Sequence, residues 1–202
     1  MKIINAHDLT PKELQGLCVR PSDGTDAPLT VVQEICLDIQ KRGDEALREY
    51  SRRFDFAAVE SFRTTPEEFD AAGATVPKAV TDALKVAAGN IRTFHAVQID
   101  SRQQVSTMLG VTCWRERRPI DTVGLYVPAG SAPLPSTVLM LGIPAVLAGC
   151  KRIVLCSPPK ANGSVDPLVL VAAEMVGISE VYKVGGAQAI ADGPTPKRQR
   201  HR

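Results

Sequence analysis

The sequence lacks any long hydrophobic run, although 44% of its 202 residues are hydrophobic and 23% are charged. A transmembrane helix needs about 20 consecutive apolar residues, so we do not expect a membrane protein. The segment Met1–His7 also lacks the hydrophobic stretch of a secretory signal peptide. We therefore expect a globular cytoplasmic protein, large enough to bury a sizeable core as one large or two small domains.

Cysteine and histidine are few and are poorly spaced for metal binding. The five cysteines are odd in number and none forms a CxxC pair, which argues against a disulfide framework and favours reduced thiols. Cys156, at the end of an expected strand, is the one cysteine considered as a nucleophile, although a cysteine there is more often simply buried. The three histidines share no HxxH or HxxxH spacing. We therefore predict no metal site within this chain.

The chain also lacks an excess of positive charge outside its last residues. Residues 192–202 carry four basic side chains and one acid, so this tail contributes +3 to a total of +2 and the remaining residues sum to −1. Nucleic-acid binding requires a basic surface, and the body of the chain offers none. The tail resembles a basic nucleic-acid patch, but a frameshift or truncation junction explains it better, and we expect it to be disordered.

Helical patterns dominate the first part of the chain. A short helix is expected over residues 8–18, capped by Asp8 or Thr10, and residues 21–28 read as a loop. Apolar residues at helical spacing follow from Thr30, Gly43 separates two helices, and further helices are expected from Pro66 and over residues 77–98. We assign residues 1–22 to an N-terminal helical segment and 23–118 to the first part of an incomplete Rossmann-like domain that is mainly helical here.

Short β-rich runs alternate with helices after residue 118. Strands are expected at residues 122–127, 152–156 and 181–184, with helices at 136–148, from Pro167, and after Gly186. Ser136 and Asp166 are the expected caps of the first two helices. This β-α-β-α-β-(α) order predicts a parallel sheet with helices wound on both sides. The predicted fold class is therefore α/β: an incomplete Rossmann-like parallel-sheet domain, residues 119–191, preceded by the mainly helical part of a second incomplete domain.

Two loops follow strands whose carboxyl ends share one edge of such a sheet, where ligands bind. Tyr126 opens a loop rich in glycine and proline, in which Ala129 and Gly130 let a ligand approach the backbone. Gln188 lies in the first turn of the helix after Gly186. A tight structural connection explains the first loop about as well as a ligand site does, and a glutamine in such a turn is more often solvated.

A long ordered series of segments carries a family resemblance. The series comprises Gly43–Leu47, Tyr50, Arg53–Asp55, Ile91–Gln98, Arg118–Pro128, Pro135–Met140, Ile143–Gly149, Cys156–Pro159 and Val184–Ala191. In this order the segments resemble the N-terminal half of the histidinol dehydrogenases, from about residue 25 to Ala191. The family usually has glycine where this chain has Ala129.

The resemblance implies a zinc- and NAD-dependent homodimeric enzyme that oxidises L-histidinol to L-histidine through an aldehyde, at the end of histidine biosynthesis. It implies two incomplete Rossmann-like domains and smaller pieces. Tyr126 and Gln188 match the tyrosine and the glutamine through which the family contacts NAD. The zinc ligands, the substrate contacts and the Glu-His pair that moves protons have no counterpart here, and we expect them in a missing C-terminal half.

Three functions remain open from the sequence. The first is a truncated or frameshifted histidinol dehydrogenase that is inactive alone. The second is a non-catalytic remnant that binds NAD weakly through Tyr126 and Gln188. The third, which the charge distribution disfavours, is a nucleic-acid-binding protein that uses the tail.

Overall fold

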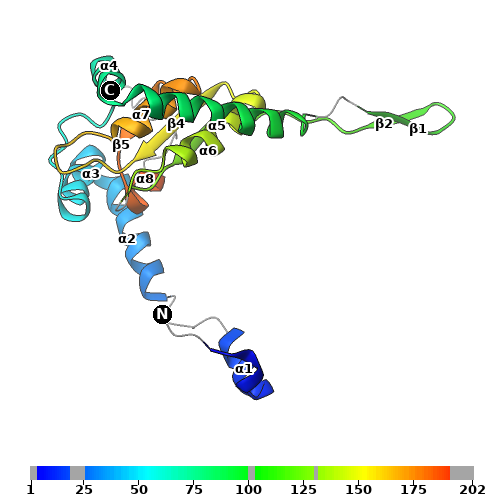
Figure 1. The fold of residues 1–202 in the computed structure, drawn as a ribbon, viewed down its shortest axis with the longest axis horizontal. Helices are drawn as coiled ribbons and strands as arrows, with labels where there is room; N and C mark the ends of the chain where they lie inside the picture. The colour runs from blue at the N-terminus through cyan, green and yellow to red at the C-terminus, as the bar shows by residue number, and fades with distance from the viewer. Residues whose placement is uncertain (1–3, 19–25, 100–102, 130–131, 192–202) are drawn as a thin grey trace. The chain divides into compact units, whose positions relative to one another are not determined.

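A computed structural model describes residues 4–18, 26–99, 103–129 and 132–191 (Figure 1). The predictions for Gly130 and for the tail 192–202 lie outside the described residues. The chain divides into two compact units, residues 1–34 and 35–202. No helix of the described segments is both long and apolar enough to cross a membrane. The domain boundaries expected at residues 22 and 118 stay predictions.

The first unit begins with the short 3-10 helix η1 (Ala6–Asp8) and helix α1 (Pro11–Cys18). Thr10 caps α1 through a reciprocal pair of bonds: its hydroxyl accepts from the Glu13 N–H at 3.4 Å, and its own N–H donates to the Glu13 carboxylate at 2.9 Å. Proline suits the first helical position because its missing N–H would be unpaired there. Helix α2 (Asp26–Arg42) starts earlier than expected, so the predicted loop is wrong for residues 26–28.

Gly43, with φ 61°, separates α2 from α3 (Asp44–Tyr50) as the sequence predicts. Directly after α3 the chain forms one turn of π-helix, η2 (Ser51–Asp55), which ends at Phe56 in the left-handed conformation with φ 53°. Neither feature is expected from the sequence. Phe56 is the one non-glycine residue with positive φ in the described part of the chain, and its side chain is 81% exposed.

Two further helices and a hairpin follow. Helix α4 (Pro66–Thr75) starts with a capping box between Thr65 and Glu68, and α5 (Lys78–Ala96) starts after Pro77. Strands β1 (Gln104–Met108) and β2 (Val111–Trp114) form an antiparallel hairpin that turns at Gly110, with φ 81°. The sequence reading of this region as helical missed the hairpin.

The central sheet is parallel, with three strands in the order β3-β4-β5. The strands and helices of this part are β3 (Thr122–Tyr126), α6 (Pro135–Leu147), β4 (Arg152–Ser157), α7 (Pro167–Met175), β5 (Glu180–Lys183) and α8 (Gly186–Ala191). The predicted β-α-β-α-β-α order is confirmed. The outer edge of β5 also pairs with the chain before α4, where the Thr64 N–H donates to Val181 and the Lys183 N–H donates to Phe62.

One face of the sheet is packed mainly by apolar side chains. Leu125, Leu155 and Val181, one from each strand, meet buried residues of α6 and α7, and α4 and α5 pack on those helices (Figure 1). Because successive strand residues point to opposite faces, these three side chains form one row. We call this side the apolar face.

The other face carries two tyrosines and a cysteine. Tyr126, Cys156 and Tyr182 are aligned across the three strands, and they pack against residues of α2, α3 and α8. Helix α8 thus covers the opposite side from α6 and α7, so the winding changes face directly after β5. We call this side the mixed face. Together the two faces confirm the predicted α/β fold, with helices on both sides of a parallel sheet.

The caps of the crossover helices follow the sequence in one case and not in the other. The Asp166 carboxylate accepts from the Leu168 N–H at 2.9 Å and caps α7 as predicted. The predicted cap Ser136 is wrong, because α6 begins one residue earlier, with Pro135 at its first position and no side-chain cap bond.

Candidate functional site

Tyr126 joins the two loops that the sequence singles out. It is the last residue of β3, and its hydroxyl accepts a hydrogen bond of 3.1 Å from the backbone N–H of Gly186, sixty residues later. The phenol thus reaches from the carboxyl end of β3 to the turn between β5 and α8. A phenolic hydroxyl that accepts one bond keeps a proton to donate. The structure brings the two predicted loops together at the carboxyl edge of the sheet.

Gln188 is not solvated, contrary to the simpler reading of its position. The side chain is only 1% exposed, and its Nε2 has no hydrogen-bond partner among the described residues. A buried amide donor without a partner is unfavourable, since it loses its hydration without compensation. A buried orphaned donor of this kind marks a position where a ligand acceptor would fit.

The backbone of the turn after β5 is tightly surrounded. A Cβ atom at Gly186, whose φ is +58°, would lie 2.7 Å from the Gln188 Oε1, and a Cβ atom at Gly185 would lie 2.6 Å from the Pro158 ring and 3.0 Å from the Asp55 Oδ1. Only glycine fits at these two positions. Because Gly185 and Gly186 have no side chains, the Gln188 amide and the Asp55 carboxyl can lie close to the main chain of the turn.

Asp55 belongs to this cluster, although sequence reasoning gave it no role. It is the last residue of the π-helix η2, and its Oδ2 is buried without a partner in the described structure. Burial raises the pKa of the Asp55 carboxyl above its ordinary value, because desolvation penalises the charged form. The only sequence signal was its place in the Arg53–Asp55 segment of the family resemblance.

Two other candidates are less promising. Cys156 is the penultimate residue of β4 and is buried on the mixed face among apolar neighbours, as the structural reading of that cysteine predicts. His95 lies on α5, where its Nδ1 is 2.8 Å from the Gln98 Oε1. In the part of the chain that the structure describes, no three His, Cys, Asp or Glu side chains gather into a group that could hold a metal ion. None of the described residues is therefore assigned to zinc.

NAD is implied by the family resemblance, and the carboxyl edge of the sheet fits it in two respects. The Gln188 amide supplies an unpaired donor, and the two glycines leave the backbone of the turn open to close approach by a ligand. The described residues thus suit a nucleotide, whereas they offer no ligand set for zinc.

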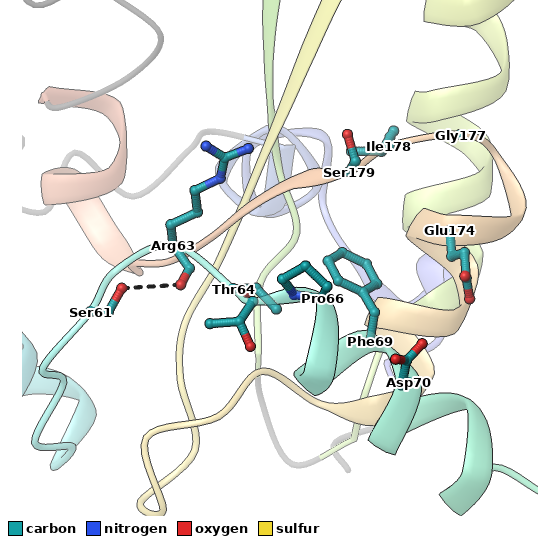
Figure 2. A pocket seen from close by; sticks show the side chains of 11 residues that line it. Ser61, Arg63, Thr64, Pro66, Phe69, Asp70, Glu174, Gly177, Ile178 and Ser179 are labelled. Atoms are coloured by element: carbon teal, nitrogen blue, oxygen red, sulfur yellow. Dashed lines mark hydrogen bonds between the residues drawn. The ribbon is translucent and has the colours of Figure 1, made fainter.

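A cavity of 710 Å³ lies elsewhere, near the amino end of β5 (Figure 2). Figure 2 shows Phe69 of α4 beside Pro66, both near the turn that contains Gly177 and Ile178. None of the predicted site residues lines this cavity. Because ligands of parallel sheets bind at the carboxyl ends of the strands, we place the candidate site at the Tyr126–Gly186 contact and not in this cavity.

Comparisons with known proteins agree on one family. The family model described as histidinol dehydrogenase matches residues 19–192. A histidinol dehydrogenase of Xanthomonas campestris is 52% identical over 160 residues, which are 79% of this chain and 37% of that protein. One of Salmonella choleraesuis is 45% identical over 190 residues, 94% of this chain and 43% of the relative.

A solved structure agrees with these matches. The crystal structure of histidinol dehydrogenase from Elizabethkingia anophelis superposes with a TM-score of 0.84 at 44% identity, covering 91% of this chain and 42% of that one. The chain thus spans about two fifths of the length of the relatives it matches. Since the family model covers most of the chain and the identities are high, the chain belongs to the histidinol dehydrogenase family.

Proposed function

We propose that this chain is the NAD-binding part of a histidinol dehydrogenase, an oxidoreductase of histidine biosynthesis that converts L-histidinol to L-histidine through an aldehyde with two molecules of NAD. The single observation that carries the proposal is the hydrogen bond from the Gly186 N–H to the Tyr126 hydroxyl, with the buried Gln188 amide two residues further on, whose Nε2 has no partner among the described residues. It joins the two loops that were expected to contact NAD.

The roles of the two side chains follow from their hydrogen-bonding capacity. The Gln188 Nε2 donates to a hydroxyl or carbonyl oxygen of the nucleotide, which removes an unsatisfied donor from the protein interior. Tyr126 accepts from the turn and donates its remaining proton to the ligand, so it both shapes the loop and binds. NAD, when bound, supplies the acceptor for the hydride that leaves the substrate.

The remaining functions belong to the rest of the whole protein. The family resemblance implies that zinc, the substrate contacts and the proton-transferring Glu-His pair lie in the part of the relatives that this chain does not span. It also implies a homodimer, and the cysteine spacing favours the cytoplasm. We therefore propose that the 202-residue chain binds NAD but does not oxidise histidinol.

Calorimetric titration of the purified chain with NAD tests this proposal. We expect saturable binding that Gln188→Ala weakens about tenfold, as for loss of one good hydrogen bond in a buried site, and no NADH formation when histidinol is added. Gln98→Ala, a change of the same type at an exposed position in the turn after α5, is the control. Turnover by the chain alone, or absence of NAD binding, would contradict the proposal.

A further inference from the structure

We propose that Asp55 is a further ligand-binding residue at the carboxyl edge of the sheet, where its carboxylate accepts hydrogen bonds from the hydroxyl groups of a ribose of NAD. The inference rests on the proposed function, because it adds a residue to the same site. Asp55 comes from the helical part of the chain before the sheet, far in sequence from Tyr126 and Gln188. It would make the helical part a direct contributor to nucleotide binding.

The position of the Asp55 carboxyl follows from its contact with the turn after β5. Its Oδ1 lies 3.0 Å from the point where a Cβ atom of Gly185 would be, and the ring of Pro158, the residue after β4, approaches the same point. Gly185 is followed directly by Gly186, which donates to the Tyr126 hydroxyl. The carboxyl group therefore lies against the same short turn that carries the Tyr126 contact and the Gln188 helix.

The unsatisfied atoms of this cluster are complementary to a sugar. The Asp55 Oδ2 is a buried acceptor and the Gln188 Nε2 is a buried donor, and both lack a partner among the residues described. A ribose hydroxyl donates one hydrogen bond and accepts others. Two neighbouring hydroxyls can therefore satisfy both protein groups, whereas a phosphate, which only accepts, would repel the carboxylate.

The local backbone holds Asp55 in an unusual conformation. The residue ends a turn of π-helix and precedes Phe56, whose φ of 53° is rare for an aromatic residue. Turns of π-helix and strained φ values concentrate at ligand sites, where surrounding contacts maintain them. The strain provides a reason, independent of the unpaired atoms, to assign a ligand role to this segment.

The pKa of Asp55 gives the inference a distinctive consequence. Within the described structure the shift has a single cause, burial, and no hydrogen bond or cation offsets it. A carboxylate in this setting destabilises the folded protein, so the neutral isostere Asn should stabilise it. A purely structural aspartate would behave in the opposite way, because its replacement would remove a favourable contact.

The experiment is a calorimetric titration of NAD into the 202-residue chain and into Asp55→Asn and Asp55→Ala, together with the melting temperature of each protein. Asp55→Asn is expected to weaken NAD binding about tenfold, as for loss of a charged hydrogen bond, while its melting temperature rises. Asp70→Asn, the same change at an exposed position on α4, should alter neither quantity.

Each outcome decides between the two proposals. If Asp55→Asn binds NAD as tightly as the unchanged chain, or melts at a lower temperature, the inference is overturned while the proposed function stands. If the unchanged chain does not bind NAD, the proposed function fails and the inference fails with it. Weaker binding with higher stability in Asp55→Asn supports both, and Asp55→Ala should then show the same loss of affinity.

Discussion

The two faces of the central sheet differ in what they bury. The apolar face is closed by α6 and α7 and is mainly hydrophobic. Its buried polar side chains include Ser157 and Lys183, which follow Leu155 and Val181 by two residues, and Lys183 is paired with Glu68 of α4. The mixed face is covered by α2, α3 and α8, and the elements around it supply three of the four buried polar atoms that lack a partner in the described structure. Those atoms are the Ser51 Oγ, the Asp55 Oδ2 and the Gln188 Nε2.

This difference separates stability from binding. Close apolar packing contributes to the free energy of folding in proportion to the area removed from water. Buried unpaired polar groups reduce that free energy unless a ligand satisfies them. We therefore expect substitutions on the apolar face to change stability alone, and substitutions on the mixed face near the turn after β5 to change NAD binding as well.

The largest effect is expected from a matched pair on and after β5. Val181 is buried on the apolar face and Val184 is buried on the mixed face. Val181→Ala should lower the free energy of unfolding by about 2–3 kcal/mol without changing NAD affinity, because it leaves a cavity in a closed core. Val184→Ala should be less destabilising but should weaken NAD binding, since Val184 supports the turn. Urea unfolding and calorimetry measure both, and identical behaviour of the two variants would remove the distinction.

The next largest effect concerns the ion pair that anchors α4 to β5. Lys183 is 7% exposed, and its Nζ lies 2.9 and 3.0 Å from the two oxygens of Glu68. Lys183→Met should cost about 2 kcal/mol, the usual value for a lost charged hydrogen bond in a shielded site. Lys78→Met, which removes the exposed pair with Asp82, should cost no more than about 0.5 kcal/mol. If both variants lose the same free energy of unfolding in urea, burial of Lys183 does not strengthen its ion pair.

A smaller effect on stability, with a large effect on binding, is expected at the glycines with positive φ. Gly186→Ala and Gly177→Ala should each cost about 1–2 kcal/mol, since alanine is strained in this conformation. Only Gly186→Ala places a methyl group against the Gln188 amide, whereas nothing lies within 4 Å of a Cβ at Gly177. NAD titration should therefore distinguish two variants that unfold alike. If Gly186→Ala keeps full NAD affinity, the amide of Gln188 does not contact the cofactor.

The smallest effect is expected from the polar network beside α3. Hydrogen bonds from Arg42 lower the pKa of the Asp38 carboxyl from its ordinary 3.8 to about 2, and Tyr50 adds a bond of 2.9 Å. Because the folded-state pKa lies below the unfolded one, this contribution to stability is complete above pH 3.8 and is lost as the pH falls towards 2. Asp38→Asn should flatten this part of the curve of stability against pH. An unchanged slope in that window would mean that Asp38 has the same pKa in both states.

The sequence predictions that the structure confirms most directly depend on residues next to one another in the chain. Asp166 before Pro167, and Gly43 between two helical patterns, specify helix ends through backbone chemistry alone. Gly110, between two short runs that contain β-branched residues, could have predicted the hairpin. The error at Ser136 has the same local origin, because a proline at the first helical position shifted the helix start by one residue.

The site required information that no local pattern contains. Gln188 is buried because α8 packs against the mixed face, a contact between segments far apart in the chain. Asp55 lies beside Gly185 at the end of the π-helix and just before the left-handed Phe56, and the sequence predicted neither feature. The family resemblance supplied Tyr126 and Gln188, and the structure adds their connection through Gly186.

The measurement that tests the account most directly is an NMR map of backbone amide shifts during NAD titration of the chain. The account predicts shifts concentrated at Tyr126, Gly185, Gly186 and Gln188, with a further shift at Asp55. Shifts concentrated instead around the cavity at the amino end of β5, at Thr64, Phe69 and Ile178, would contradict it. That result would place the nucleotide at the opposite end of the sheet from the site assigned here.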